Sequence, residues 1–242
     1  MKLKLLLAKA AIYLLVLLGL GYLVSCSDSA CIKGEGSIEQ RELQLQPFSK
    51  IESEGDFKVY LTQGSPQKVE VKGEPNILSD LSTEVVDGKW KIRHRSCVRR
   101  SKAVEVYITV PEVSELSING SGSISSTNSL EAGNLALSVN GSGKANIAAI
   151  AERIITRLSG SGEITLSGET NMNTIVLSGS GRIASYSLQA DDVIVTLSGS
   201  GRADVTALNN LTVTISGSGS VYYDGSPSVS SEISGSGKVV RR

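Results

Sequence analysis

Aliphatic residues recur at fixed distances on both sides of a repeated Gly-Ser-Gly tripeptide in the second half of the chain. The tripeptide occurs seven times, with first glycines Gly120, Gly141, Gly160, Gly179, Gly199, Gly217 and Gly235. The intervals between these glycines are 21, 19, 19, 20, 18 and 18 residues. A near-constant period of this length indicates a repeat architecture, in which each repeat packs on its neighbours.

The hydrophobic pattern within a repeat predicts strands on both sides of the tripeptide. The residue two before the first glycine is always aliphatic: Ile118, Val139, Leu158, Leu177, Leu197, Ile215 and Ile233. So is the residue four after it: Ile124, Ala145, Ile164, Ile183, Ala203, Val221 and Val239. The position three after the glycine is polar instead: Ser123, Lys144, Glu163, Arg182, Arg202, Ser220 and Lys238. A spacing of two places alternate side chains on opposite faces of a strand.

We therefore predict an all-β fold, a β-helix-like solenoid of stacked coils with Gly-Ser-Gly corners. The first glycine supplies a positive φ, so each tripeptide bends the strand. The serine column and the Asn/Ser column before the glycine would form hydrogen-bonded ladders. An antiparallel β-meander with the glycines in its hairpin turns is an alternative. A meander would not require the aliphatic residues to keep the same distance from the tripeptide on both sides of every repeat. A flexible linker would lack the aliphatic columns.

The N-terminal residues 1–25 read as a signal peptide. Lys2, Lys4 and Lys9 precede an apolar run that ends at Leu23-Val24-Ser25-Cys26. This ending resembles a bacterial lipobox, which predicts that Cys26 carries the lipid; a transmembrane anchor is the alternative reading. Residues 26–40 would then be the lipid anchor and tether, residues 41–112 an irregular N-terminal β section and residues 113–242 the repeat solenoid.

Within the irregular section, Ile51, Gly55 and Val59 keep the phase of the repeats, so Lys50 to Thr62 is predicted to be a degenerate coil. Asp87-Gly88 predicts a hairpin turn. Cys31 and Cys97 are the cysteines that remain after lipidation, and the sequence leaves open whether they form a disulfide.

Candidate chemistry is sparse. Two cysteines and one histidine do not make a metal set, so we expect no metal and no cofactor. His94 stands between two arginines and is expected to be a surface strand residue. The basic cluster from Lys89 to Lys102 could attract an anionic glycan or lipid headgroup, but a solvated loop is the favoured reading. Asp191, Asp192 and Asp204 could form an isolated site, although acids in loops are more often simply solvated.

Charge argues against nucleic acid as a partner. The chain has 24 basic and 24 acidic residues, and removal of residues 1–25 takes away three basic ones, which leaves a net charge of −3. No stripe of lysine or arginine opposes that conclusion.

Several stretches resemble the auto-transporter adhesin head GIN domain family, whose function is unknown. They are Phe48 to Ile51, Val59 to Gly64, Val106 to Pro111, the Gly-Ser-Gly series, and Val221 to Pro227 with Gly235 to Val239. The resemblance covers about residues 47 to 240. It implies a β-helix-like fold and a location in the envelope of Gram-negative bacteria, and it supplies no catalytic residues.

We expect a non-enzymatic, lipid-anchored protein of the bacterial cell envelope, located at the outer membrane. The sequence leaves open whether the protein faces the periplasm or the cell surface. The expected role is an adhesin-like binding or scaffold module with a protein or glycan partner. A second copy could cover the open end of the stack, which would give a homo-oligomer. The alternatives are a periplasmic structural or stress-related component with protein partners, and a β-helical carbohydrate-active enzyme.

Overall fold

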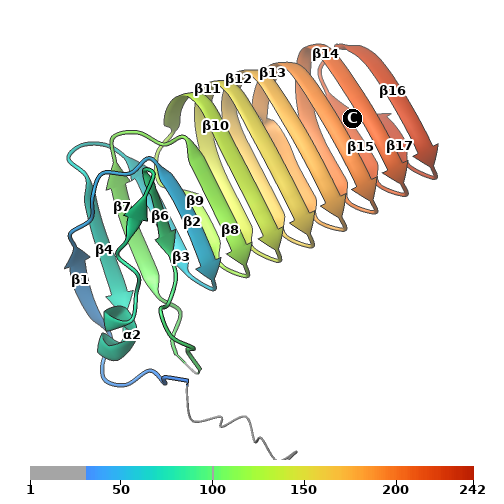
Figure 1. Ribbon diagram of the computed structural model, residues 1–242. Coiled ribbons are helices and arrows are strands. Elements are labelled where there is room, and N and C mark those ends of the chain that lie inside the picture. The colour runs from blue at the N-terminus through green and yellow to red at the C-terminus, as the bar shows by residue number, and fades with distance from the viewer. Residues whose placement is uncertain (1–30, 100) are drawn as a thin grey trace, which may run out of the picture. The chain divides into compact units, whose positions relative to one another are not determined.

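The computed structural model describes residues 31–99 and 101–242, and this part of the chain is built almost entirely of strands. In the middle of the stack, each turn of the chain is one long strand that pairs in parallel with the next. The result is a β-solenoid, seen as the row of ribbons in Figure 1, and it confirms the predicted fold. The long strands are β10 (Leu130–Gly141), β11 (Lys144–Gly160), β12 (Glu163–Gly179), β13 (Arg182–Gly199) and β14 (Arg202–Gly217).

Shorter strands make the coils on either side of these. The preceding coil consists of β8 (Glu115–Gly120) and β9 (Ser123–Ser126). The following coils consist of β15 (Ser220–Asp224), β16 (Ser228–Gly235) and β17 (Lys238–Arg241). Strands β15 and β16 both pair with β14, and β17 pairs with β15.

The tripeptide glycines form one column along the stack. The parallel register places Gly179 beside Gly160 on one side and Gly199 on the other. Gly179 has a φ of +114°, and a Cβ atom added to it would lie 2.5 Å from the carbonyl oxygen of Gly160. The predicted positive φ is therefore confirmed, and close approach of the neighbouring coil is a second reason for glycine there. The other first glycines share the positive φ: Gly120, Gly141, Gly160, Gly199, Gly217 and Gly235.

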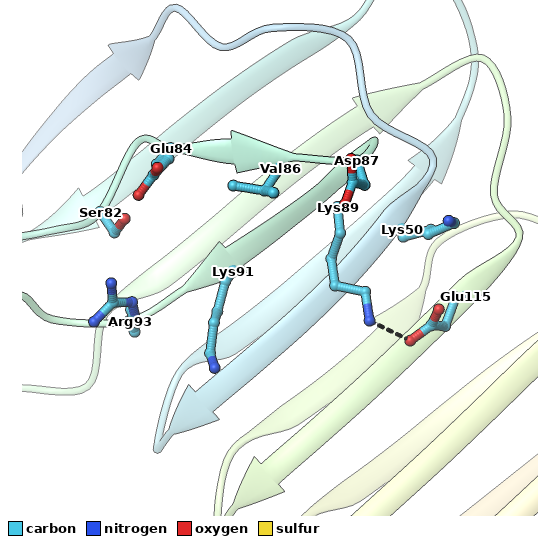
Figure 2. Close-up of a pocket in the computed structure, with 9 residues that line it drawn as sticks. All are labelled: Lys50, Ser82, Glu84, Val86, Asp87, Lys89, Lys91, Arg93 and Glu115. Atoms are coloured by element: carbon cyan, nitrogen blue, oxygen red, sulfur yellow. Dashed lines mark hydrogen bonds and ion pairs between the residues drawn. The ribbon is translucent and has the colours of Figure 1, made fainter.

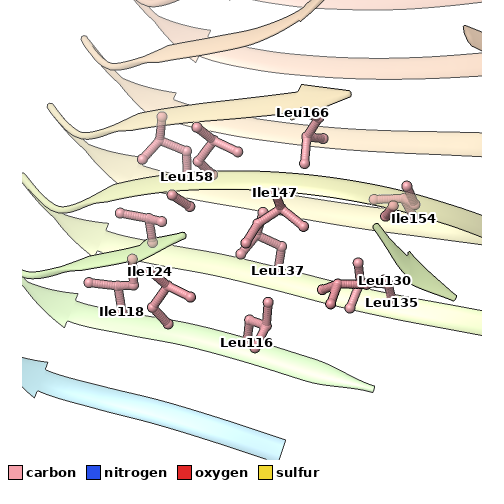
Figure 3. Close-up of a cluster of buried hydrophobic side chains, with 14 of the residues drawn as sticks. Leu116, Ile118, Ile124, Leu130, Leu135, Leu137, Ile147, Ile154, Leu158 and Leu166 are labelled. Carbon is pink, nitrogen blue, oxygen red and sulfur yellow. The ribbon is translucent and has the colours of Figure 1, made fainter. Parts of the chain in front are cut away.

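The aliphatic columns form the core. Figure 3 shows Ile118, Ile124 and Leu158 turned into the interior of the stack, together with side chains from the opposite walls of the coils. These side chains expose at most 1% of their surface. Ile233 differs, with 41% of its surface exposed, because no further described coil covers it. The alternation beside the tripeptides thus produces a mostly apolar interior, in which Thr156 and Asn173 are buried polar residues.

The predicted serine ladder is made by the backbone and not by the hydroxyl groups. The Ser161 amide donates to the Gly141 carbonyl oxygen at 3.0 Å, and the Ser180 amide donates to that of Gly160 at 3.0 Å. Within residues 31–99 and 101–242, no hydrogen bond joins the hydroxyls of the central serines. The Asn/Ser column forms a side-chain ladder only at its start, where the Asn140 amide donates to Asn119 at 2.9 Å.

The predicted degenerate coil is present. Strand β2 (Lys50–Gly55) pairs in parallel with β8, which aligns Gly55 with Gly120, and β3 (Lys58–Gln63) pairs in parallel with β9. On the opposite edges of β2 and β3 lie β6 (Lys89–Ile92) and β7 (Glu105–Val110). The chain between these strands therefore adds a layer at the N-terminal end of the stack.

Antiparallel strands complete this layer, as Figure 1 shows. Strand β5 (Val85–Val86) forms the predicted Asp87-Gly88 hairpin with β6. Strand β4 (Lys68–Gly73) pairs with β7, and β1 (Glu39–Leu43) pairs with β4. The short helix α2 (Pro75–Ser79) follows β4. Trp90 is fully buried here, packs on Phe48 and donates its indole N–H to the Ser82 carbonyl oxygen at 3.0 Å.

Candidate functional site

A shallow pocket of about 470 Å³ lies beside the β5–β6 hairpin. Figure 2 shows the charged side chains around it, which come from the hairpin and from the neighbouring coils. Its lining residues are Lys50, Ser82, Glu84, Val86, Asp87, Lys89, Lys91, Arg93 and Glu115. It contains three members of the basic cluster that the sequence suggested as an anion site, together with Lys50 and three acids.

Acidic neighbours already pair with two of these lysines. The Lys89 ammonium donates to Glu115 at 2.7 Å, the dashed contact in Figure 2. Lys91 lies 2.6 Å from a Glu54 carboxylate oxygen. These hydrogen bonds raise the pKa of Lys89 and of Lys91, so both lysines stay protonated. Their charge is balanced within the fold, which makes the pocket a weak anion site.

His94 is more buried than the sequence suggested. Its side chain exposes only 16% of its surface and lies against the ring of Phe57, with 5.0 Å between ring centroids. Burial lowers the pKa of His94, although the nearby Asp80 and Asp56 carboxylates oppose that shift. The sequence did not indicate this burial, because the flanking arginines favour a solvent-exposed position for His94. The fold instead turns the imidazole toward Phe57.

A second cluster lies on the outer face of the C-terminal coils and is centred on Asp204. This carboxylate is fully buried. Arg182 donates to its Oδ2 atom through Nη2 at 2.7 Å and through Nε at 3.1 Å. Arg202 donates to Oδ1 through Nε at 2.7 Å. Asp204 is therefore a clamp for two guanidinium groups and not a free metal ligand.

Tyrosines and two further cations surround this clamp. The Arg202 guanidinium lies 4.1 Å from the centroid of the Tyr222 ring, and the Lys238 ammonium lies 5.6 Å from the same centroid. Arg242 lies over the ring of Tyr186 at 4.8 Å. The hydrogen bond to Asp204 raises the pKa of Arg202, and burial followed by the charge of Asp204 raises that of Tyr186. We call this surface the arginine–tyrosine patch: Arg182, Tyr186, Arg202, Tyr222, Lys238 and Arg242 over Asp204.

The sequence pattern did not indicate this patch because its members are far apart in the chain. The register brings them together: Arg182 pairs with Arg202, Arg202 with Ser220, and Ser220 with Lys238. All four occupy the polar position three residues after the first glycine of a repeat. Reading that column as a row of neighbours, and not as generic outward residues, would have found the cations.

The other predicted site residues have simpler outcomes. Cys31 and Cys97 are both disulfide-bonded. Beside them, the Ile32 amide donates to the Cys97 carbonyl oxygen at 2.8 Å. Cys26 and the rest of the predicted signal peptide lie outside the described residues. Among the residues that are described, no group of three or more His, Cys, Asp or Glu side chains could hold a metal ion. No helix in the same part of the chain is long and apolar enough to cross a bilayer.

These features define a β-solenoid whose outer face carries an organised cationic surface at the C-terminal coils. Residues 47–227 match the family described as "Putative auto-transporter adhesin, head GIN domain". The chain belongs to this family, as the sequence resemblance implied. Family membership indicates a protein of the cell envelope or cell surface.

Solved structures share the fold. A protein from Bacteroides fragilis, described as a putative adhesin, is 24% identical, and the match covers 87% of this chain and 100% of that one with a TM-score of 0.83. A protein from Parabacteroides distasonis, described as a putative lipid binding protein, is 26% identical, with 87% and 99% of the two chains covered and a TM-score of 0.75. A putative adhesin from the same species is 22% identical, with the same coverage and a TM-score of 0.74. No curated protein matches the chain.

Proposed function

We propose that this protein is a lipid-anchored, non-enzymatic module of the bacterial envelope that binds another macromolecule through the outer face of its coil stack. The observation that carries the proposal is the register of the coils. Equivalent outward residues, such as Glu163, Arg182 and Arg202, are stacked as direct neighbours on parallel strands. Adjacent strands are about 4.8 Å apart, so the face presents side chains at a regular spacing.

A rigid scaffold favours binding because little conformational entropy is lost when the partner docks. The long strands hold each coil by extensive parallel backbone pairing, and the interior is mostly apolar. The adhesin descriptions of the family and of two solved relatives support a binding role. Anchoring at Cys26 rests on the lipobox resemblance of the sequence.

Anchoring and exposure can be tested together. We expect the wild-type protein and the matched control Ser27→Ala to incorporate labelled palmitate, and Cys26→Ala to incorporate none. Protease treatment of intact cells should remove the domain while a periplasmic marker survives. Incorporation of palmitate by Cys26→Ala at the wild-type level would refute the lipid anchor. A domain that is protected until the outer membrane is opened would refute the surface role.

The alternatives give different results in the same cells. A periplasmic structural or stress-related component would be protected from protease and would yield crosslinked protein partners. A carbohydrate-active enzyme would release product from a polysaccharide panel. Binding of the purified protein to cells, matrix or glycan preparations without product release supports the proposed module, and a failure to bind any of them contradicts it.

A further inference from the structure

We propose that the arginine–tyrosine patch binds an acidic polysaccharide, one that carries carboxylate or sulfate groups along its chain. The inference rests on the proposed function and identifies the partner by its chemistry. The patch brings four cations together against one carboxylate, and that carboxylate is buried beneath them.

Asp204 presents the two arginines for binding without using all of their donors. Arg182 uses Nε and Nη2 on Asp204, which leaves Nη1. Arg202 uses Nε alone, which leaves both Nη groups. The two side chains remain 50% and 44% exposed. A guanidinium held in place by a buried acid loses little entropy on binding, and its planar fork matches carboxylate and sulfate oxygens.

The cations follow the solenoid axis. Arg182, Arg202 and Lys238 occupy the same column, with Ser220 between the last two. With neighbouring strands about 4.8 Å apart, they form a line of charge and not a compact cluster. A linear polyanion can follow such a line, whereas an isolated phosphate group would contact only part of it.

The patch fits a soluble polyanion better than a membrane. The large hydrophobic side chains exposed in the described residues lie outside it, so the patch has no apolar side chain to insert into a bilayer. The faces of Tyr186 and Tyr222 carry cations, so they are not free platforms for nucleic-acid bases. The energy of binding is therefore expected to be electrostatic and to fall as salt is added.

The test is calorimetric titration of the full chain, purified as expressed in a neutral detergent. The probes are an oligogalacturonate, a sulfated oligosaccharide and a neutral maltooligosaccharide of equal length. Glycerol 3-phosphate represents a lipid headgroup, and single-stranded DNA represents nucleic acid. We expect binding of one or both acidic sugars, weakened by salt, and much weaker binding of the other probes. Equal or tighter binding of DNA or glycerol phosphate would overturn the proposal.

Variants locate the site without disturbing Asp204. The double variant Lys238→Ala/Arg242→Ala keeps both arginine contacts to Asp204 and removes two of the four cations, so it should weaken binding by about tenfold or more. The control, Arg153→Ala/Arg157→Ala, removes the same charge from exposed positions elsewhere and should bind like wild type. Ser220→Arg fills the gap in the column and should tighten binding.

The outcomes separate this inference from the proposed function. If the two double variants lose affinity equally, or Ser220→Arg has no effect, the patch is not the site, yet binding of the wild-type protein to cells would still support the module. If wild-type protein binds no acidic sugar but binds cells, the partner class is wrong. If it binds neither, the proposed function also fails.

Discussion

Four glycine-to-alanine substitutions can separate the two constraints that shape the corners. Gly179 combines a φ of +114° with a neighbouring carbonyl oxygen 2.5 Å from the added Cβ atom. Gly181 has no positive φ, but its Cβ atom would lie 2.7 Å from the Gly162 carbonyl oxygen. Gly88 has a φ of +69° and no atom within 4 Å of its added Cβ atom. Gly133 has neither constraint.

The expected free-energy changes follow from these environments. Gly133→Ala should stabilise by about 0.4–1 kcal/mol, because alanine restricts the unfolded chain. Gly88→Ala should cost about 1–2 kcal/mol for its left-handed backbone. Gly181→Ala should cost about 1–3 kcal/mol for overpacking. Gly179→Ala meets both constraints, so its cost should be about 2–6 kcal/mol.

The assay is denaturant unfolding followed by far-ultraviolet circular dichroism, with midpoint and slope compared for all four variants. A common slope would license comparison of the free energies, since long repeat proteins can lose cooperativity. Gly179→Ala as mild as Gly133→Ala would refute the stacked-corner geometry. Gly179→Ala as mild as Gly88→Ala would show that the neighbouring coil does not crowd the corner.

Three further predictions concern charge and crosslinking. In the folded protein the pKa of His94 lies below its ordinary value of 6.5, so the unfolded chain binds the proton first as the pH falls. The stability of the fold should therefore decrease below pH 6.5. His94→Gln should reduce this decrease in thermal unfolding scans between pH 7 and 5. Arg182→Ala/Arg202→Ala leaves the buried Asp204 carboxylate without its cationic partners and should lower the free energy of unfolding by about 3–5 kcal/mol, measured with denaturant. Asp204→Asn should cost less, because the two half-exposed arginines that it leaves unpaired remain hydrated. Equal losses in the two variants would contradict this reasoning. The disulfide-bonded Cys31 and Cys97 close a loop of about 66 residues, so Cys31→Ser/Cys97→Ser should cost about 4 kcal/mol in the same assay, and added reductant should not destabilise that variant further.

The sequence was most informative where one physical constraint repeats. Burial of Ile118 and Leu158 follows from their alternation with polar residues, and the positive φ of Gly179 follows from its place between two strands. Stacking in register then determines which coils touch, so the parallel pairing of the long strands was predictable. The same logic identified the degenerate coil around Gly55.

The remaining features depend on contacts that no local pattern encodes. Strands β6 and β7 pair with one edge of β2 and β3, and β8 and β9 pair with the other edge. His94 is buried because this layer brings it against Phe57. The arginine–tyrosine patch requires the register of four coils and an acid beneath them, and single-residue reasoning treated Asp204 as a loop acid.

The irregular register of the strands opposite the corners has an evolutionary consequence. Strands β13 and β14 are in register at Arg182 and Arg202, shift between Ser185 and Gln189, and return to register by Gly199 and Gly217. Insertions and deletions on the far side of a coil are therefore absorbed before the next corner. Lineages can change the length of individual coils, or duplicate whole ones, while the columns beside the glycines keep their alignment. Selection can thus add residues to the outward column, or change them, one coil at a time.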